Sequence, residues 1–210
     1  MRHWLERLPS RYPRVERFNH DYPLRAAPPS GRSLEIGAGL GGHVEHEDLS
    51  VQEYHAVELR PELANALRER VAEVRVVAAN CQEGLPYPDG FFDRVLAIHV
   101  LEHLPDLPSA LDEVQRVLQP HGRFVVVIPC EGGLGYSLGR RLTVQRTFQR
   151  RYGVPYEPFV RAEHLNVPGE IQSELRSRFQ VIDETYWPLR VPWVHPNLLI
   201  GITLEHFPGS

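Results

Sequence analysis

The sequence predicts a doubly wound α/β fold in which a mostly parallel, seven-stranded sheet ends in an antiparallel hairpin at one edge. Short apolar segments alternate with helical patterns from residue 32 to residue 130, and two more strand-like segments follow after residue 180. The 210 residues are 42% hydrophobic and 24% charged, which is typical of a globular chain with a substantial core. No run of 18 uncharged apolar residues occurs, so no transmembrane segment is expected.

Each element of the first part follows from its local pattern. Two helices are predicted, one beginning at Pro61 with Leu63 and Leu67 on its apolar face, and one at 107–118 that ends before Pro120. Strands that alternate with helices at this spacing pair in parallel through right-handed crossovers. The predicted strands are the short apolar segments 32–37, 53–58, 74–79, 92–100 and 123–129.

The two ends of the sequence have different patterns. Prolines are frequent before residue 31, so residues 1–31 are predicted to be an irregular lead-in. Asn166 is predicted to cap a helix whose apolar stripe is Ile171, Leu175 and Phe179. The remaining predicted elements are a helix at 138–152 and an antiparallel pair of edge strands at 181–187 and 198–204.

The composition excludes several chemistries. All 23 basic residues are Arg, so lysine Schiff-base chemistry and a Walker A phosphate loop are both excluded. Residues 33–135 hold seven Arg against 17 acidic residues, which argues against a nucleic-acid groove in this part. The only cysteines are Cys81 and Cys130, so no disulfide framework is expected, and a reducing cytoplasm is the simplest location.

A glycine run follows the first predicted strand. Gly37, Gly39 and Gly42 permit close approach of the backbone to a ligand, and they also satisfy the dinucleotide-binding pattern. Glu58 ends the second strand, where a carboxylate can accept hydrogen bonds from ribose hydroxyls. A tight turn that binds nothing remains an alternative, so the run by itself does not identify the ligand.

Three further features distinguish these alternatives. Glu35 lies two residues before the first glycine, a Leu-Pro-Tyr-Pro-Asp segment begins at Leu85, and residues 99–104 are His-Val-Leu-Glu-His-Leu. With these motifs, residues 32–130 resemble the class I S-adenosylmethionine-dependent methyltransferases, in particular a large bacterial group with the last motif. The resemblance implies a Rossmann-like fold and S-adenosyl-L-methionine as cofactor.

The resemblance also implies roles for individual residues. The glycine loop would pass beneath the methionine part of the cofactor, and Glu58 would bind the ribose hydroxyls. Asn80 stands where the family usually has Asp, beside the adenine amino group, and its carbonyl oxygen can still accept a hydrogen bond. The implied cofactor-binding residues are Glu35, Gly37, Ala38, Gly39, Gly41, Glu58, Leu59, Asn80, Cys81 and His99.

Methyl transfer to a hydroxyl needs a base, and His99 and His103 are the candidates for this catalytic role. The alternative is that His99 packs against the cofactor while His103 caps the following turn. With Glu102 and a contribution from residues 163–164, the two histidines also have the spacing of a metal site, although no metal is assigned. Cys130 follows a proline, as the nucleophile of cytosine methyltransferases does, but a small buried cysteine is the simpler interpretation.

The tail is expected to complete the site. Residues 131–180 are predicted to be an insertion that covers the acceptor, in which Arg141 and His164 bind the substrate. An Arg-rich helix face there favours an anionic acceptor, unless it is merely solvated. The chain is then one methyltransferase domain. It consists of a lead-in (1–31), a cofactor-binding core (32–130), the insertion (131–180) and the edge strands (181–210).

The predicted function is therefore methyl transfer to a small molecule or glycan, at oxygen, with no nucleic-acid partner. Two alternatives remain. A catalytically weak, S-adenosylmethionine-binding regulatory module would be consistent with the departure at Asn80. A nicotinamide-dependent oxidoreductase is disfavoured because a Tyr-x-x-x-Lys pair cannot occur without Lys.

Overall fold

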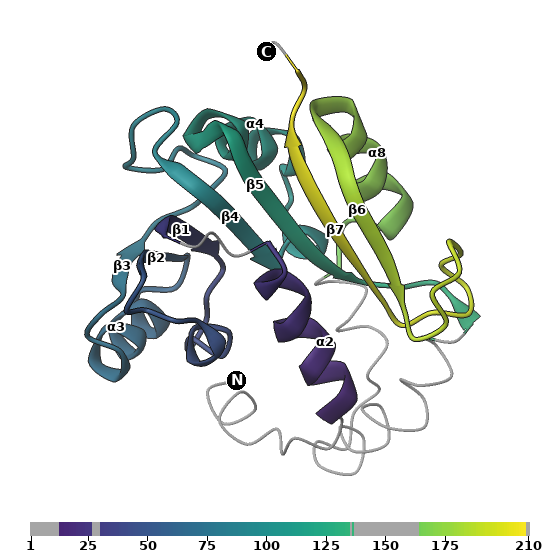
Figure 1. The fold of residues 1–210 in the computed structure, drawn as a ribbon, viewed down its shortest axis with the longest axis horizontal. Helices are drawn as coiled ribbons and strands as arrows, with labels where there is room; N and C mark the ends of the chain where they lie inside the picture. The colour runs from purple at the N-terminus through teal and green to yellow at the C-terminus, as the bar shows by residue number, and fades with distance from the viewer. Residues whose placement is uncertain (1–12, 27–29, 135, 137–163, 209–210) are drawn as a thin grey trace.

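The computed structural model describes residues 13–26, 30–134, 136 and 164–208. Within these residues, seven strands form one sheet in the order β3-β2-β1-β4-β5-β7-β6 (Figure 1). The first five strands pair in parallel, whereas β7 is antiparallel to both β5 and β6. This confirms the predicted doubly wound sheet and its antiparallel edge. The strands are β1 (Gly31–Ile36), β2 (Gln52–Glu58), β3 (Arg75–Ala78), β4 (Phe92–Ile98), β5 (Leu118–Pro129), β6 (Phe179–Trp187) and β7 (Leu199–His206).

The chain reverses its direction of strand addition between β1 and β4. It runs outward from β1 through β2 to β3, and then returns to place β4 on the other side of β1, with Ile36 opposite Ala97. The carboxyl ends of β1 and β4 therefore open into neighbouring loops. Ligands of open α/β sheets bind at such a switch point, because the loops diverge there.

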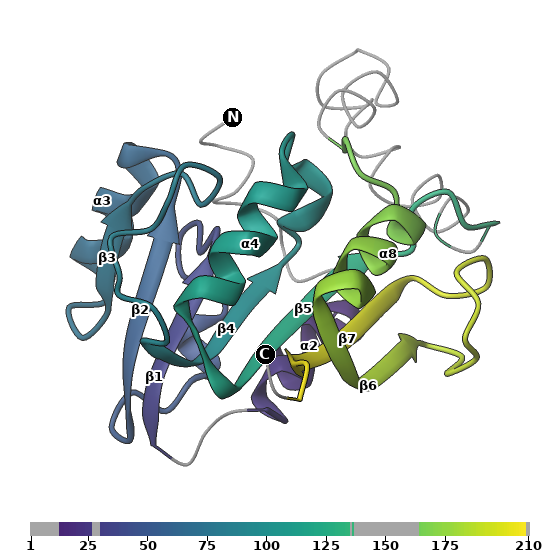
Figure 2. The ribbon, with the colours of Figure 1, turned by 90° about the horizontal axis from the view of Figure 1, so that it is seen from above.

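Helices cover both faces of the sheet. Helices α4 (Leu107–Val117) and α8 (Pro168–Arg178) lie side by side on one face, and α2 (Pro13–Leu24) lies on the other (Figure 2). Helix α3 (Pro61–Arg70) packs beside β3. Alternate residues of β5 serve the two faces: Val126 belongs to the cluster under α4, and Val125 to the cluster under α2. The sheet is therefore buried on both sides, as parallel sheets require.

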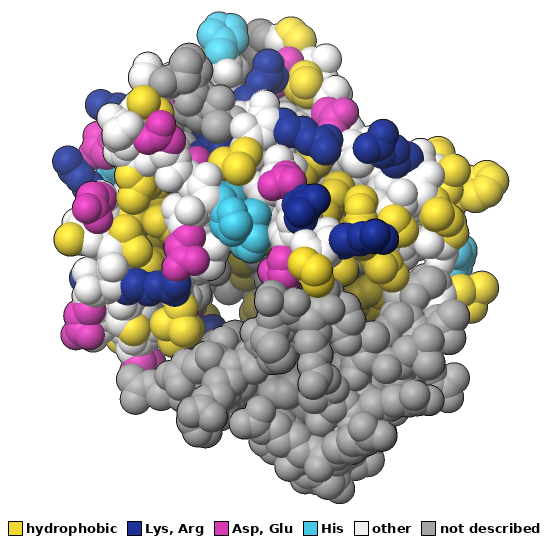
Figure 3. All heavy atoms as spheres, turned by 60° about the horizontal axis from the view of Figure 1, so that its bottom comes forward, with side chains coloured by type: hydrophobic (Ala, Val, Ile, Leu, Met, Phe, Trp, Pro, Cys, Tyr) yellow, Lys and Arg dark blue, Asp and Glu magenta, His cyan; other side chains and the backbone are white. Residues whose placement is uncertain are grey.

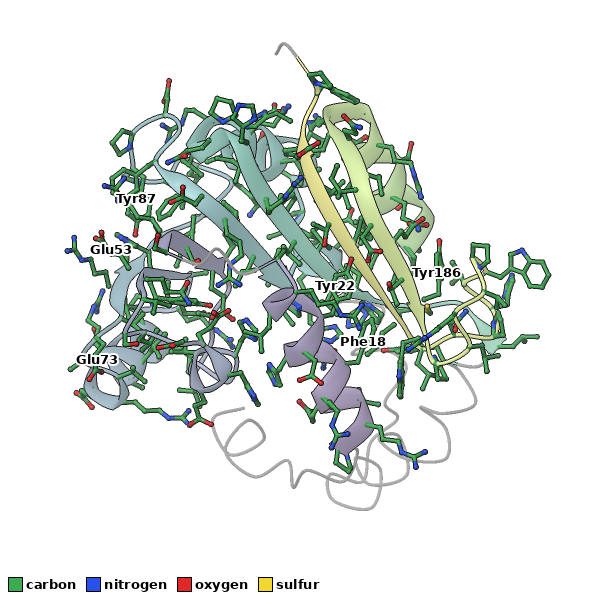
Figure 4. The ribbon with its side chains drawn as sticks, in the orientation of Figure 1. Phe18, Tyr22, Glu53, Glu73, Tyr87 and Tyr186 are labelled. Atoms are coloured by element: carbon green, nitrogen blue, oxygen red, sulfur yellow. The ribbon has the colours of Figure 1, made fainter. Side chains whose placement is uncertain are left out.

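The prediction of an irregular lead-in was wrong for residues 13–24, which form α2. Pro13 is the first residue of this helix, a position where a missing N–H is tolerated. Phe18 and Tyr22, one turn apart, are 6% and 1% exposed, and both lie on the sheet side of α2 (Figure 4). Burial of this aromatic stripe stabilises a helix that proline content alone argues against.

The edge elements differ in detail from the predictions. Helix α8 begins at Pro168 rather than after a cap at Asn166, whose Nδ2 instead donates to the carbonyl oxygens of Leu101 and Leu104 at 2.8 and 2.7 Å. Phe179 is the first residue of β6, not the end of the helical stripe. The predicted helix at 138–152 lies outside the described residues. Among the described residues, no helix is both long enough and apolar enough to cross a membrane.

A buried ion pair fixes the chain beyond the glycine run. Arg94 of β4 is fully buried, and its Nη2 donates to Glu47 Oε1 at 2.8 Å. Burial by itself would raise the pKa of Glu47, but its hydrogen bond to His43 and the charge of Arg94 lower it to about 2. Arg94 Nη1 also donates to the carbonyl oxygen of Pro23 at 3.3 Å, so the pair ties α2 to the sheet.

Candidate functional site

The glycine loop begins where β1 ends. Gly37 and Gly39 have φ of +71° and +56°, the left-handed region that disfavours other residues. A Cβ at Gly37 would lie 2.5 Å from Val100 Cγ2, whereas a Cβ at Gly39 would have no atom within 4 Å. Gly37 is therefore required by packing and by its backbone angle. Gly39 borders open space at the carboxyl end of the sheet, where a ligand can rest against the backbone.

Glu58 joins this loop to the end of β2. Glu58 is 4% exposed, and its Oε2 accepts a hydrogen bond from the backbone N–H of Gly39 at 3.0 Å. The other oxygen, Oε1, accepts from the backbone N–H and the Nε of Arg60 at 3.0 and 3.1 Å. The carboxylate is thus held beside the open space above Gly39. Leu59 follows it and is 61% exposed, so an apolar side chain also borders this edge.

Asn80 and Cys81 follow β3. The Asn80 side chain is engaged within its own turn: Oδ1 accepts from the backbone N–H of Gln82 at 3.1 Å, and Nδ2 donates to Glu83 Oε1 at 2.8 Å. Cys81 is buried, and burial raises the pKa of its thiol to about 11. Contact of either residue with an adenine ring stays a prediction.

Glu35 lies within the sheet rather than at its surface. Glu35 is 4% exposed, and its Oε2 accepts a hydrogen bond from the hydroxyl of Tyr54 at 3.0 Å. Burial raises the pKa of Glu35 to about 8, against the lowering effect of the Tyr54 hydrogen bond. At neutral pH the carboxyl is therefore mostly protonated, and it supports the strand that carries the glycine loop. Contact with a cofactor amino group stays a prediction.

His99 follows β4 and has φ of +54°, which is uncommon for a residue with a side chain. Such a conformation is unfavourable by about 1–3 kcal/mol and persists only where its surroundings enforce it. Two side chains flank the imidazole: Asn19 Oδ1 lies 3.0 Å from Nε2, and Glu102 Oε1 lies 3.4 Å from Nδ1. Strained backbone and engaged ring nitrogens together mark His99 as a functional candidate.

Glu102 belongs to the short 3-10 helix η2 (Leu101–His103) and is 2% exposed. Among the described residues, its Oε2 has no hydrogen-bond partner. Burial raises the pKa of Glu102, but the hydrogen bond to His99 and the charges of His99 and His103 outweigh it, so the pKa is lowered. The buried carboxylate therefore stays ionised beside the two histidines.

The chain that follows the undescribed part of the tail returns to this cluster. The rings of His103 and His164 meet edge to face with centroids 4.7 Å apart, and His164 Nδ1 pairs with Glu131 Oε2. The backbone N–H of Leu165 donates to the Glu102 carbonyl oxygen at 2.7 Å. The structure thus brings His164 to the carboxyl end of β4. Arg141, with the other arginines of its predicted helix, lies outside the described residues.

The metal and nucleophile alternatives receive no support from the described residues. Within them, no three His, Cys, Asp or Glu side chains are arranged to hold a metal ion. Cys130 is completely buried, and burial raises the pKa of its thiol to about 12. A thiol with this pKa is protonated at neutral pH and is a poor nucleophile.

Two features near the site were not predicted from the sequence. Asn19 contacts His99 from a helix that was not predicted, although Pro13 and the spacing of Phe18 and Tyr22 could have indicated that helix. A stack of three histidines also joins α2 to the loop after the glycine run. These residues are His20, His43 and His46. The space-filling view shows a histidine patch near the centre of one face (Figure 3).

Comparison with known proteins agrees with this geometry. Residues 34–126 match the family model described as a methyltransferase domain. The chain is 35% identical over 103 residues to the sterol 4-C-methyltransferase of Caenorhabditis elegans, covering 44% of this chain and 29% of that protein. It is 36% identical over 104 residues to a malonyl-[acyl-carrier protein] O-methyltransferase of Halorhodospira halophila, covering 48% and 35%. The chain therefore spans about a third of the length of these relatives.

Solved structures share the fold over most of the chain. The 1,6-didemethyltoxoflavin-N1-methyltransferase of Burkholderia thailandensis, bound to S-adenosylhomocysteine, superposes with a TM-score of 0.62. The match covers 91% of this chain and 78% of that one at 21% identity. Residues 34–126 thus match a methyltransferase domain, and the chain shares its fold with a methyltransferase solved in complex with S-adenosylhomocysteine. The residues that match this domain, 34–126, run from within β1 to within β5.

Proposed function

We propose that this protein transfers a methyl group from S-adenosyl-L-methionine to a hydroxyl of a small molecule or glycan. The observation that carries the proposal is the open space over Gly39, bounded by the Glu58 carboxylate at the carboxyl ends of β1 and β2. A buried acid beside a glycine loop suits a ligand with vicinal hydroxyls. Glu58 would bind the ribose, and Gly37 to Gly41 would support the methionine part.

Methyl transfer from this cofactor requires few catalytic groups from the protein. S-adenosylmethionine supplies a methyl group already activated on a sulfonium, so the protein must align the acceptor and remove its proton. His99, at the carboxyl end of β4, would take that proton, and His103 is the second candidate. The relatives named above methylate a sterol and a malonyl-acyl carrier protein, so their acceptors differ, and the oxygen acceptor here is a proposal.

The insertion at 131–180 would cover the acceptor. The contacts of His164 with His103 and Glu131 support this role, because they hold residue 164 at the carboxyl end of β4. Arg141 would orient an anionic acceptor. A cytoplasmic location without a nucleic-acid partner remains part of the proposal, supported by two free, buried cysteines and by the acidic residues 33–135.

Calorimetry with two ligands tests the cofactor assignment. S-adenosylhomocysteine should bind to the full chain, and NAD should give no measurable heat of binding. Tight NAD binding would overturn the proposal in favour of an oxidoreductase. Binding of S-adenosylhomocysteine with no turnover on any panel of hydroxylated acceptors would favour the regulatory module, for which the engagement of Asn80 in its own turn is the supporting observation.

A further inference from the structure

The His99 ring lies between acceptor groups from two different elements. Asn19 projects from α2 toward Nε2, and Glu102 projects from η2 toward Nδ1. The imidazole is one-third exposed, so it is accessible from the open end of the sheet while both of its nitrogens have partners. Among the described residues, Glu16 also interacts electrostatically with His99, and His103 with Glu102.

The Glu102 carboxylate requires that Nδ1 of His99 carry a proton. An ionised carboxylate has no proton to donate, so it is matched only by a nitrogen that bears one. Its burial strengthens this preference, because a buried charge without a proton donor is strongly unfavourable. Glu102 Oε2 is buried and has no hydrogen-bond partner among the described residues. The hydrogen bond from His99 Nδ1–H to Oε1 is therefore the main side-chain interaction that stabilises this buried carboxylate.

Asn19 places no such restriction on Nε2. A carboxamide carries an acceptor oxygen and a donor nitrogen on one planar group, and a half-turn about its terminal bond exchanges them. It can therefore accept from Nε2–H or donate to the Nε2 lone pair. Nε2 is thus the nitrogen whose resting contact with Asn19 can form both with and without a proton on it.

We infer that Glu102 is a positioning residue that holds His99 as its Nδ1–H tautomer, so that Nε2 is the basic atom. In the resting site, the Asn19 carboxamide forms a hydrogen bond with Nε2 whether or not Nε2 carries a proton. The inference rests on the proposed function. For the transfer, the acceptor hydroxyl would take the place of the Asn19 amide at the single lone pair of Nε2. As the acceptor oxygen bonds to the methyl carbon and the sulfur–methyl bond breaks, the O–H proton would move to Nε2. The imidazolium so formed faces the Glu102 carboxylate, and Nε2 later releases the proton to water.

Nitrogen-15 NMR of the full chain labelled at histidine reports the tautomer directly, with His99 assigned by the signals lost in His99→Gln. The neutral wild-type ring should be predominantly Nδ1–H. Glu102→Gln should lower the ratio of Nδ1–H to Nε2–H tautomer about tenfold or more, because a hydrogen bond to a charged group is replaced by an amide that can also donate. Asn19→Ala should leave this ratio in favour of Nδ1–H and perturb only the Nε2 signal.

A matched control is Glu131→Gln, which alters the carboxylate paired with His164 and should leave the His99 signals unchanged. A wild-type ring that is predominantly Nε2–H, or a ratio unaffected by Glu102→Gln, would overturn the inference. If that variant does not fold, the wild-type tautomer alone decides the question. Binding of S-adenosylhomocysteine, measured separately, tests the proposed function, so either idea can fail without the other.

Discussion

The ring of Tyr22 lies directly against Gly201 of β7. A Cβ at Gly201 would lie 2.6 Å from both Cδ1 and Cε1 of that ring. The Tyr22 hydroxyl donates to Asp183 Oδ2 at 2.9 Å and lies 3.1 Å from Thr203 Oγ1. These contacts fix α2 on the antiparallel edge of the sheet. Because Asn19 is less than one turn away, they also set where that side chain meets His99.

Gly201→Ala should lower the free energy of unfolding by about 1–3 kcal/mol, since the added methyl group must displace a buried ring. Urea denaturation at neutral pH measures the effect. Gly169→Ala is the control, because a Cβ there meets no atom within 4 Å and alanine favours the helix. Equal stability of the Gly201 variant and the wild type would contradict the close packing of Tyr22.

Glu35 should make the protein less stable as the pH rises. Burial raises its folded-state pKa to about 8, above the ordinary value of 4.5. The stabilisation from its protonated form is complete below pH 4.5 and is lost as the pH rises through 8. Glu35→Gln keeps an oxygen for the Tyr54 hydroxyl but cannot ionise.

Denaturation curves collected from pH 5 to pH 9 test this prediction. The wild type should lose stability across that range relative to Glu35→Gln, so that the variant becomes the more stable protein at high pH. Glu69→Gln, at an exposed position on α3, should follow the wild type. Parallel pH profiles for the wild type and Glu35→Gln would show that the carboxyl is ionised throughout.

Glu58→Ala should weaken S-adenosylhomocysteine binding by about 1–3 kcal/mol, because the Gly39 N–H loses a charged acceptor, as would the ribose hydroxyls proposed to bind there. Glu58→Gln should have a smaller effect, since its carbonyl oxygen still accepts. Calorimetry gives both affinities, with Glu69→Ala, at an exposed position on α3, as a control. Unchanged affinity in Glu58→Ala would make this residue a strand-end anchor and nothing more.

Cys81 and Cys130 should resist thiol reagents in the folded protein. Burial raises their pKa values to about 11 and about 12, so thiolate is scarce at pH 8. Colorimetric thiol titration should count two reactive groups only after denaturation. Cys130→Ala should also retain S-adenosylhomocysteine binding. Rapid reaction of a native thiol would revive the nucleophile hypothesis for Cys130.

The parallel core could be predicted from sequence because its signals are local. In β4 and β5 the apolar residues form continuous runs, whereas in the helix between them they recur at helical spacing. Turn residues mark the ends of these segments. The glycine run and Glu58 could be predicted to lie together, because neighbouring parallel strands end at one edge. Strand boundaries were the least accurate part: β5 begins at Leu118, five residues before the predicted strand.

Features that depend on contacts between distant segments could not be predicted. Asn166 has the chemistry of a helix cap, but its amide satisfies two carbonyl groups of η2 and the turn after it. The contact of Asn19 with His99 joins residues that are 80 positions apart, and no periodicity records it. The burial that keeps Glu35 protonated likewise depends on the packing of the whole sheet.

The position of β7 has a consequence for synthesis of the chain. This strand lies between β5 and β6, yet it is the last of the seven described strands to be made. After β5 leaves the ribosome, its outer edge lacks β7, its partner among the described strands, until about 70 more residues have been added. At about 5–20 residues per second, that edge stays open for roughly 4–14 seconds. During this interval the nascent chain exposes an apolar strand edge that can pair with another molecule, so chaperone binding at this stage would protect its yield.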